Sequence, residues 1–138
     1  EVAGEVAPGI NLSASYALVD AEDSDGSQLN TSYPRQQAKV YATWQLPGDW
    51  SRLTLGAGGT WQGDTYRNTD TPTGSEKVGQ GDVFLANAMA RYRFNDNFST
   101  QLNVSNLFDE EYYTQQGFYS QYLYGAPRSA LLSMTYDF

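Results

Sequence analysis

The sequence predicts an all-β fold in which an antiparallel sheet forms part of the wall of a transmembrane β-barrel. Seven segments alternate apolar and polar residues, which is the pattern of strands with two different faces. The connections between these segments are alternately short and long, and the last segment, 130–138, is an amphipathic strand with aromatic residues on its apolar face. Outer-membrane barrels combine these three features, because one strand face meets lipid and the other meets water.

The first three predicted strands are residues 1–6, 10–18 and 35–46. Val2 and Val6 share a face opposite two glutamates, and Pro8-Gly9 predicts a tight turn. The second segment alternates from Ile10 to Leu18 and leads into an acidic polar loop. The third alternates up to a second turn sequence, which begins at Pro47.

The remaining predicted strands are residues 51–64, 82–94, 98–106 and 130–138. The glycine-rich middle of segment 51–64 predicts bending or a close approach of backbones. A third turn is expected at Asp96, whereas residues 66–80 and 107–125 are expected to be long loops. Short turns at one end and long loops at the other are typical of outer-membrane barrels, whereas sandwiches mix loop lengths.

The two predicted faces differ in charge as well as in hydropathy. Lys39, Arg52, Arg91 and Arg93 all fall on the polar face. An arginine at mid-bilayer on the lipid side costs about 2–4 kcal/mol, so this face is expected to meet water. The aromatic residues of the apolar face fall into two girdles. At the tight-turn end they are Trp44, Tyr92, Phe94, Tyr136 and Phe138, and at the long-loop end Tyr16, Trp61 and Phe84.

The composition excludes several classes of function. The formal net charge of -8 argues against a nucleic-acid partner, because phosphate binding needs a basic stripe. The chain has no cysteine and no histidine, so disulfides, thiol chemistry and the commonest metal ligand are absent. No apolar run approaches the roughly 20 residues of a spanning helix. An alternation that begins at Glu1, without a signal peptide, predicts that the chain is part of something longer.

The acidic segments do not predict a metal or catalytic site. The run 21–26 resembles the opening of a calcium loop, but Ala21 occupies the first ligand position and Ser32 the twelfth. The carboxylates of Asp109, Glu110 and Glu111 have no defined partner that would make an acid–base pair. We therefore expect no catalytic residue and no bound metal or cofactor.

The third long loop is the candidate binding site, because it concentrates tyrosines at the mouth of the predicted lumen. Tyrosine rings can stack on a ligand while their hydroxyls form hydrogen bonds. The alternative is that these rings pack the loop onto itself or belong to the outer girdle. The candidate ligand-binding residues are Tyr112, Tyr113, Tyr119, Tyr122, Tyr124 and Arg128.

The end of the chain resembles a known family. The motif Asn106-Leu107-Phe108-Asp109-Glu110-Glu111-Tyr112-Tyr113, the segment 124–128 and the terminal 134–138 resemble the C-terminal end of TonB-dependent outer-membrane receptors, most closely the ferripyoverdine-receptor-like group that takes up ferric siderophores. Within this motif the family positions are Asn106, Leu107, Phe108, Asp109 and Tyr113.

This resemblance implies a barrel of about 22 strands, plugged by an N-terminal domain that this chain lacks. Residues 1–138 would be the C-terminal barrel segment, located in the Gram-negative outer membrane. The implied ligand is a ferric siderophore, and the implied partners are the other strands and plug, outer-membrane lipid, TonB and the assembly machinery. The residues resembling the assembly signal are Leu132, Met134, Tyr136 and Phe138.

Two other classes of protein fit parts of the pattern. A small structural or adhesive barrel of the eight-stranded kind would need one more strand before Glu1. A soluble carbohydrate-binding β-sandwich would use exposed tyrosine and tryptophan side chains instead.

Overall fold

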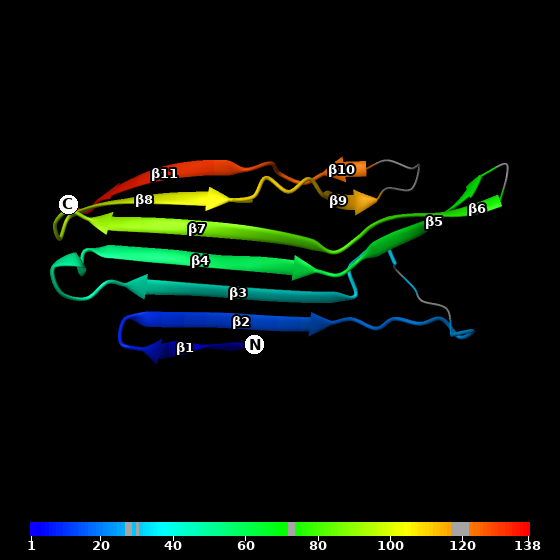
Figure 1. Ribbon diagram of the computed structural model, residues 1–138, viewed down its shortest axis with the longest axis horizontal. Coiled ribbons are helices and arrows are strands. Elements are labelled where there is room, and N and C mark those ends of the chain that lie inside the picture. The colour runs from blue at the N-terminus through cyan, green and yellow to red at the C-terminus, as the bar shows by residue number, and fades with distance from the viewer. Residues whose placement is uncertain (27–28, 30, 72–73, 117–121) are drawn as a thin grey trace.

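The computed structural model describes the whole chain except residues 27–28, 30, 72–73 and 117–121. It contains one large antiparallel sheet and two small hairpins (Figure 1). The large sheet has seven strands in the order β1-β2-β3-β4-β7-β8-β11. Its strands are β1 (Val2–Ala7), β2 (Ile10–Leu18), β3 (Gln36–Gln45), β4 (Leu53–Gln62), β7 (Val83–Arg93), β8 (Phe98–Ser105) and β11 (Ser129–Tyr136). These seven strands lie within a residue or two of the predicted segments.

Neighbouring strands of the sheet are also neighbours in sequence, apart from the two hairpins inserted between them. The tight turns β1–β2, β3–β4 and β7–β8 lie at one end of the sheet, and the long connections lie at the other (Figure 1). The turn between β3 and β4 contains a short 3-10 helix, η1 (Gly48–Trp50). The described residues form no second layer over the large sheet, so the soluble sandwich alternative is wrong.

Residues 66–80 and 107–125 were predicted as long loops, and the prediction was wrong where each of them contains a β-hairpin. Residues 65–80 include a hairpin of β5 (Thr65–Thr71) and β6 (Gly74–Gln80), and the third loop includes β9 (Tyr113–Gln116) paired with β10 (Tyr122–Tyr124). Both hairpins are rich in polar residues, so the apolar alternation that marks the large sheet is missing from them.

The register aligns the two predicted faces across the sheet. One cross-strand row consists of Leu12, Ala42, Ala57, Ala88, Val104 and Ala130. The neighbouring row, on the opposite face, consists of Asn11, Thr43, Gly56, Met89, Asn103 and Leu131. We call the first face the apolar face and the second the polar face. A shift of one residue would exchange the faces, so this alignment is strongly specified.

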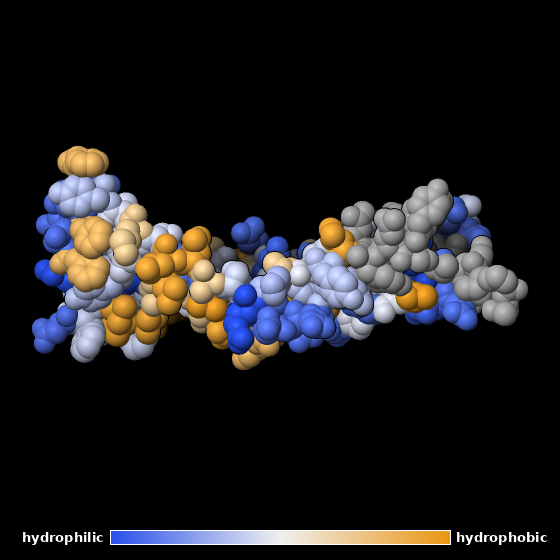
Figure 2. Space-filling model, turned by 90° about the horizontal axis from the view of Figure 1, so that it is seen from above, coloured by the Kyte–Doolittle hydropathy of each residue, from blue (hydrophilic) through white to orange (hydrophobic). Residues whose placement is uncertain are grey.

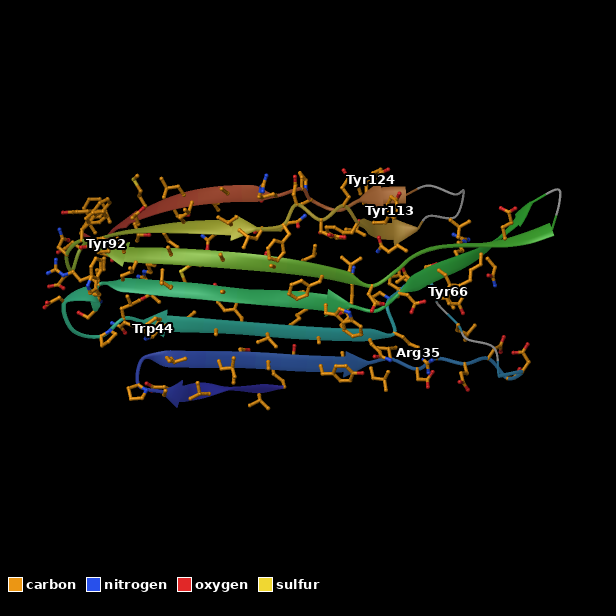
Figure 3. The ribbon with its side chains drawn as sticks, viewed as in Figure 1. Arg35, Trp44, Tyr66, Tyr92, Tyr113 and Tyr124 are labelled. Carbon is orange, nitrogen blue, oxygen red and sulfur yellow. The ribbon has the colours of Figure 1, made fainter. Side chains whose placement is uncertain are left out.

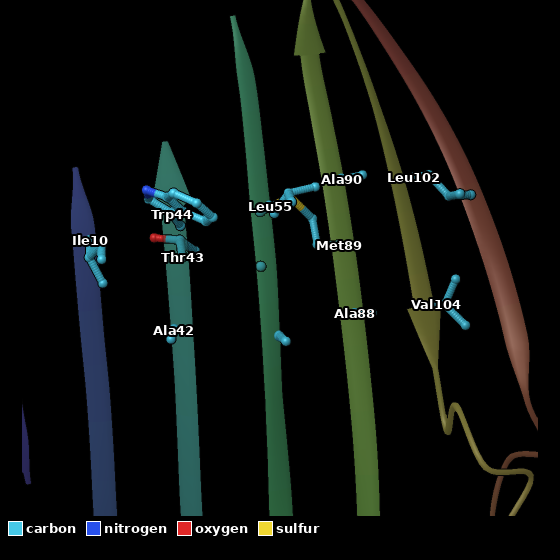
Figure 4. A pocket seen from close by; sticks show the side chains of 12 residues that line it. Ile10, Ala42, Thr43, Trp44, Leu55, Ala88, Met89, Ala90, Leu102 and Val104 are labelled. Carbon is cyan, nitrogen blue, oxygen red and sulfur yellow. The ribbon is translucent and has the colours of Figure 1, made fainter. Parts of the chain in front are cut away.

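Small residues make a shallow hollow in the middle of the apolar face (Figure 4). The hollow is almost entirely apolar. Its lining residues come from β2, β3, β4, β7 and β8 and are Ile10, Ala42, Thr43, Trp44, Leu55, Gly56, Ala57, Ala88, Met89, Ala90, Leu102 and Val104. Seen from the β11 edge, hydrophobic side chains gather along the strands toward the tight-turn end (Figure 2).

Very little of the chain is buried in a core. Val83 and Ala86 are the buried apolar residues of the described chain, and none of its large side chains is fully buried. A single sheet without a second layer leaves both faces open, which is the state expected of a piece of barrel wall. Within the described ranges, no helix is long and apolar enough to cross a bilayer.

The predicted aromatic clusters are present at the tight-turn end. Trp44 and Tyr92 lie there (Figure 3). The ring centroids of Tyr92 and Phe94 are 4.9 Å apart, and those of Tyr136 and Phe138 are 5.2 Å apart. The backbone beyond β11 is held by the turn before β8, because Asp137 N donates to Asn97 O at 2.9 Å and Asn97 Nδ2 donates to Asp137 O at 2.8 Å.

Candidate functional site

The three long connections meet at one end of the sheet, where they enclose a hollow of about 130 Å³. Each connection contributes part of the lining, which consists of Ser32, Tyr33, Pro34, Gln62, Thr65, Gln80, Tyr112, Tyr113 and Thr114. The hollow has both polar and aromatic walls. It is therefore suited to a ligand with an aromatic or amide-rich surface rather than to a purely apolar one.

Main-chain and side-chain hydrogen bonds join the three connections. The N–H of Tyr66 in β5 donates to the carbonyl oxygen of Thr31 in the first connection at 2.8 Å. The half-buried side chain of Gln80 joins the second connection to the third, because its Nε2 donates to Tyr113 O at 3.0 Å and its Oε1 accepts from Tyr113 N at 2.7 Å. The Gln80 amide thus pairs with both backbone groups of Tyr113, as a residue of a neighbouring strand would.

Asn106 fixes the start of the third connection. Its side chain is 5% exposed, its φ is 51°, and its amide Nδ2 donates to Glu110 O at 2.9 Å and to Ala126 O at 3.1 Å. Its Oδ1 accepts from Glu110 N at 2.9 Å, while its backbone N donates to Asn87 Oδ1 at 3.2 Å. Asparagine tolerates this left-handed backbone and supplies both donors and an acceptor.

Asp109 closes the other side of the same loop base. Its φ is 58°, and its Oδ1 accepts from the backbone N of Arg128 at 2.7 Å. Leu107 N donates to Ala86 O on β7 at 2.8 Å, which attaches the motif to the sheet. The motif 106–113 therefore holds the base of the third connection in place against the sheet. The sequence motif alone did not indicate this structural role. Leu107 and Phe108 are exposed beside it.

The structure brings two of the six candidate ligand-binding residues into ring contact. The ring centroids of Tyr113 on β9 and Tyr124 on β10 are 4.9 Å apart, with an angle of 52° between their planes (Figure 3). Tyr124 is 66% exposed. The exposed ring of Tyr124, beside the half-buried ring of Tyr113, offers a surface on which a planar ligand can stack.

The other four candidates have different positions. The ring of Tyr112 covers Gly125, whose N donates to Tyr112 O at 2.7 Å, so this ring packs the loop base. Arg128 is exposed and is held by its backbone bond to Asp109. Tyr122 is placed by its backbone, opposite Gln116 in the β9–β10 hairpin. Tyr119 lies outside the described residues.

Charges around the long-loop end are mostly acidic. Arg35 Nη2 and Asp20 Oδ1 form an ion pair at 2.6 Å. Lys77 Nζ lies 3.7 Å from the ring centroid of Tyr66. Among the same described residues, no group of carboxylates could hold a metal ion.

The residues resembling the assembly signal share one exposed stripe. Leu132, Met134 and Tyr136 alternate along β11 on the apolar face, and each is more than half exposed. Phe138 continues the stripe beyond the strand, which ends at Tyr136 and not at the last residue as expected. The outer edge of β11 has no partner strand among the described residues.

The fold and the loop geometry define a β-barrel wall with its connections gathered at one mouth. Residues 1–107 match the sequence profile of a family described as TonB dependent receptor-like, beta-barrel. The chain belongs to this family of barrel receptors, which confirms the resemblance drawn from the C-terminal motif.

Two relatives from Pseudomonas match the chain over its whole length. It is 40% identical over 139 residues to the ferric-pyoverdine 358 receptor of Pseudomonas putida, and 37% identical over 140 residues to the ferripyoverdine receptor of Pseudomonas aeruginosa. Each alignment covers 100% of this chain, but only 16% and 17% of the two relatives.

Solved structures have the same arrangement of strands. The ferripyoverdine receptor of the Pseudomonas aeruginosa outer membrane, bound to ferripyoverdine, superposes with a TM-score of 0.92 at 37% identity and covers 99% of this chain. The open form of the ferric-catecholate import receptor Fiu from E. coli K12 gives 0.78 at 26% identity and covers 97%. This chain corresponds to 18% and 19% of those two structures.

Proposed function

We propose that this chain is the C-terminal part of the barrel wall of an outer-membrane receptor that takes up a ferric siderophore, with energy supplied through TonB. The observation that carries the proposal is the single sheet with aligned apolar and polar faces, which superposes on a ferripyoverdine-bound receptor with a TM-score of 0.92. The relatives named above are receptors for ferric-pyoverdine and ferric-catecholate ligands.

In this proposal the apolar face meets lipid and the polar face meets the lumen. The tight turns then lie on the periplasmic side and the long connections outside the cell, as outer-membrane barrels arrange them. The free edges of β1 and β11 pair with strands from the rest of the receptor, since an open edge in lipid leaves backbone groups without hydrogen bonds. The stripe ending at Phe138 serves as the signal for barrel assembly.

The siderophore contacts the third connection at the ring pair of Tyr113 and Tyr124, together with Arg128. The two rings supply stacking surface, and the guanidinium supplies charge for an anionic chelate. Tyr112 contributes indirectly, because its ring supports the loop base at Gly125. The sequence also predicts Tyr119 and Tyr122 as ligand-binding residues, and Tyr119 lies outside the described residues.

Uptake of radioactive ferric siderophore by cells that carry the full-length receptor tests this function. We expect Tyr124→Ala to weaken binding of ferripyoverdine, because truncating one stacked ring removes about 0.5–1.5 kcal/mol beyond its buried area. The matched control is Tyr16→Ala, which removes a ring of similar exposure, 59%, from the apolar face of β2.

Equal loss of uptake in both variants, at equal receptor levels in the outer membrane, would contradict a ligand role for Tyr124. Normal uptake in a strain deleted for the full-length receptor would contradict the proposed function as a whole.

A further inference from the structure

The backbone that follows β11 is held by the tight turn between β7 and β8, which lies at the same end of the sheet (Figure 1). The ladder between β8 and β11 ends where Tyr136 pairs with Phe98. One residue further on, Asp137 N donates to Asn97 O at 2.9 Å, and Asn97 Nδ2 donates to Asp137 O at 2.8 Å. Asn97 therefore extends the pairing of β11 by one residue beyond the strand.

The side chain of Asn97 takes the place of a backbone donor in this pair. Two residues in a hydrogen-bonded antiparallel pair normally exchange both of their N–H···O bonds. The backbone N–H of Asn97 does not take part in this exchange, because it donates to Asn95 Oδ1 at 2.9 Å within the turn. The same Oδ1 accepts from Phe98 N at 2.8 Å. The carbonyl oxygen of Asp137 thus depends on a side-chain donor, which the amide of asparagine supplies.

This pairing leaves the backbone groups of the preceding residue directed outward. Successive residues of a strand in an antiparallel sheet point their N–H and C=O groups toward opposite edges. Because Asp137 bonds toward β8, the backbone groups of Tyr136 point toward the outer edge of β11. That edge has no partner strand among the described residues. Such an edge presents a row of unpaired donors and acceptors to another strand.

The bonds to Asn97 lie between two aromatic residues of the exposed stripe. The ring centroids of Tyr136 and Phe138 are 5.2 Å apart, and both side chains are exposed. Segments beyond the end of a strand fray unless they are tied down. The two hydrogen bonds of Asp137 therefore determine whether Phe138 continues the line of β11.

We propose that Asn97 is a positioning residue for assembly of the barrel. Its side chain keeps the backbone after β11 extended, so that the stripe ending at Phe138 is presented together with a straight outer edge. The partner that fits this edge is a β-strand of the assembly machinery, which pairs with the free N–H and C=O groups while the aromatic rings are recognised beside it. The inference rests on the proposed function, in which this stripe is the assembly signal.

Photo-cross-linking in cells that synthesise the full-length receptor tests this role. A photo-reactive phenylalanine derivative at position 138 retains the aromatic ring and reports contact with the assembly machinery during a pulse of synthesis. Asn97→Leu has a similar size but lacks the amide. We expect it to lower the cross-link yield several-fold and to slow the appearance of folded receptor, detected by its heat-modifiable mobility, by a similar factor. Asn97→Gln keeps the amide donor and should recover part of both.

The matched control is Asp96→Leu, which makes a similar change one residue earlier in the same turn. The Asp96 carboxylate has no hydrogen-bond or ion-pair partner among the described residues. We expect this variant to cross-link and to assemble at the rate of the parent receptor.

The stability of the assembled receptor separates positioning from a purely structural role. Strands on both sides hold β11 once the barrel is closed, so Asn97→Leu should unfold at the denaturant midpoint of the parent. An Asn97→Leu receptor that cross-links and assembles like the parent would overturn the proposal, whatever its midpoint. An equal loss of cross-linking in Asp96→Leu would overturn it as well. Neither measurement uses a siderophore, so failure of ferripyoverdine uptake would be distinguishable from failure of this inference.

Discussion

At the scale of single residues, Asn106 forms three hydrogen bonds through its side chain. It satisfies two carbonyl oxygens and one backbone N–H within a nearly closed site, in a backbone conformation that few residues adopt. Removing a partner from a buried polar group costs about 1–3 kcal/mol for each group left unpaired. The third connection should therefore depend on this side chain.

We expect Asn106→Ala to lower the free energy of unfolding of the full-length receptor by about 3 kcal/mol or more. Asn106→Gly restores an unstrained backbone at φ 51° and leaves the hydrogen bonds missing, so it should recover only a part of that loss. Asn11→Ala, on the exposed polar face of β2, is the matched control with a small effect. Denaturant unfolding in detergent measures all three. A loss no larger than that of the control would contradict the role given to Asn106.

At the scale of elements, the β5–β6 and β9–β10 hairpins are coupled by the side chain of Gln80. Its two hydrogen bonds to Tyr113 join hairpins that have no strand pairing with each other. Each hairpin alone has two strands, and an isolated two-stranded hairpin is marginally stable in water. The coupling therefore sets how rigidly the tyrosine pair is presented.

We expect Gln80→Leu to speed hydrogen exchange at the Tyr113 amide by roughly 5- to 150-fold, because a loss of about 1–3 kcal/mol corresponds to that range. Gln80→Glu keeps an acceptor for Tyr113 N but cannot donate to Tyr113 O, so its effect should be smaller. Protection at Leu102, in the middle of β8, should remain unchanged in both variants. Unchanged exchange at Tyr113 in Gln80→Leu would show that the amide does not couple the hairpins.

The same elements show what the sequence could and could not predict. The seven strands of the large sheet follow from apolar alternation, which the register confirms through rows such as Leu12 to Ala130. The two hairpins were missed because residues such as those of Thr65–Thr71 lack an apolar face. The ring packing of Tyr112 and the bonds of Gln80 depend on residues distant in sequence, so no local pattern indicates them.

At the scale of the whole molecule, acidic, apolar and aromatic residues occupy different zones along the strands. Most carboxylates lie in the connections, the apolar face spans the sheet, and aromatic rings gather at the tight-turn end (Figures 2 and 3). The tight-turn row contains Leu53 and Tyr92, and the long-loop row contains Trp61 and Phe84. Ala42 and Ala57 lie in a row midway between them, which places this row near the centre of the proposed membrane band.

Neighbouring residues of β3 can test this orientation, because Ala42 and Thr43 project from opposite faces. We expect Ala42→Arg to reduce the stability of the full-length receptor by about 2–4 kcal/mol, the cost of an arginine at the lipid midplane. Thr43→Arg should cost less, since its side chain projects from the polar face, which meets water in the proposed lumen. Denaturant unfolding in lipid vesicles compares the two variants. Equal costs, or a larger cost for Thr43→Arg, would mean that the apolar face does not meet lipid.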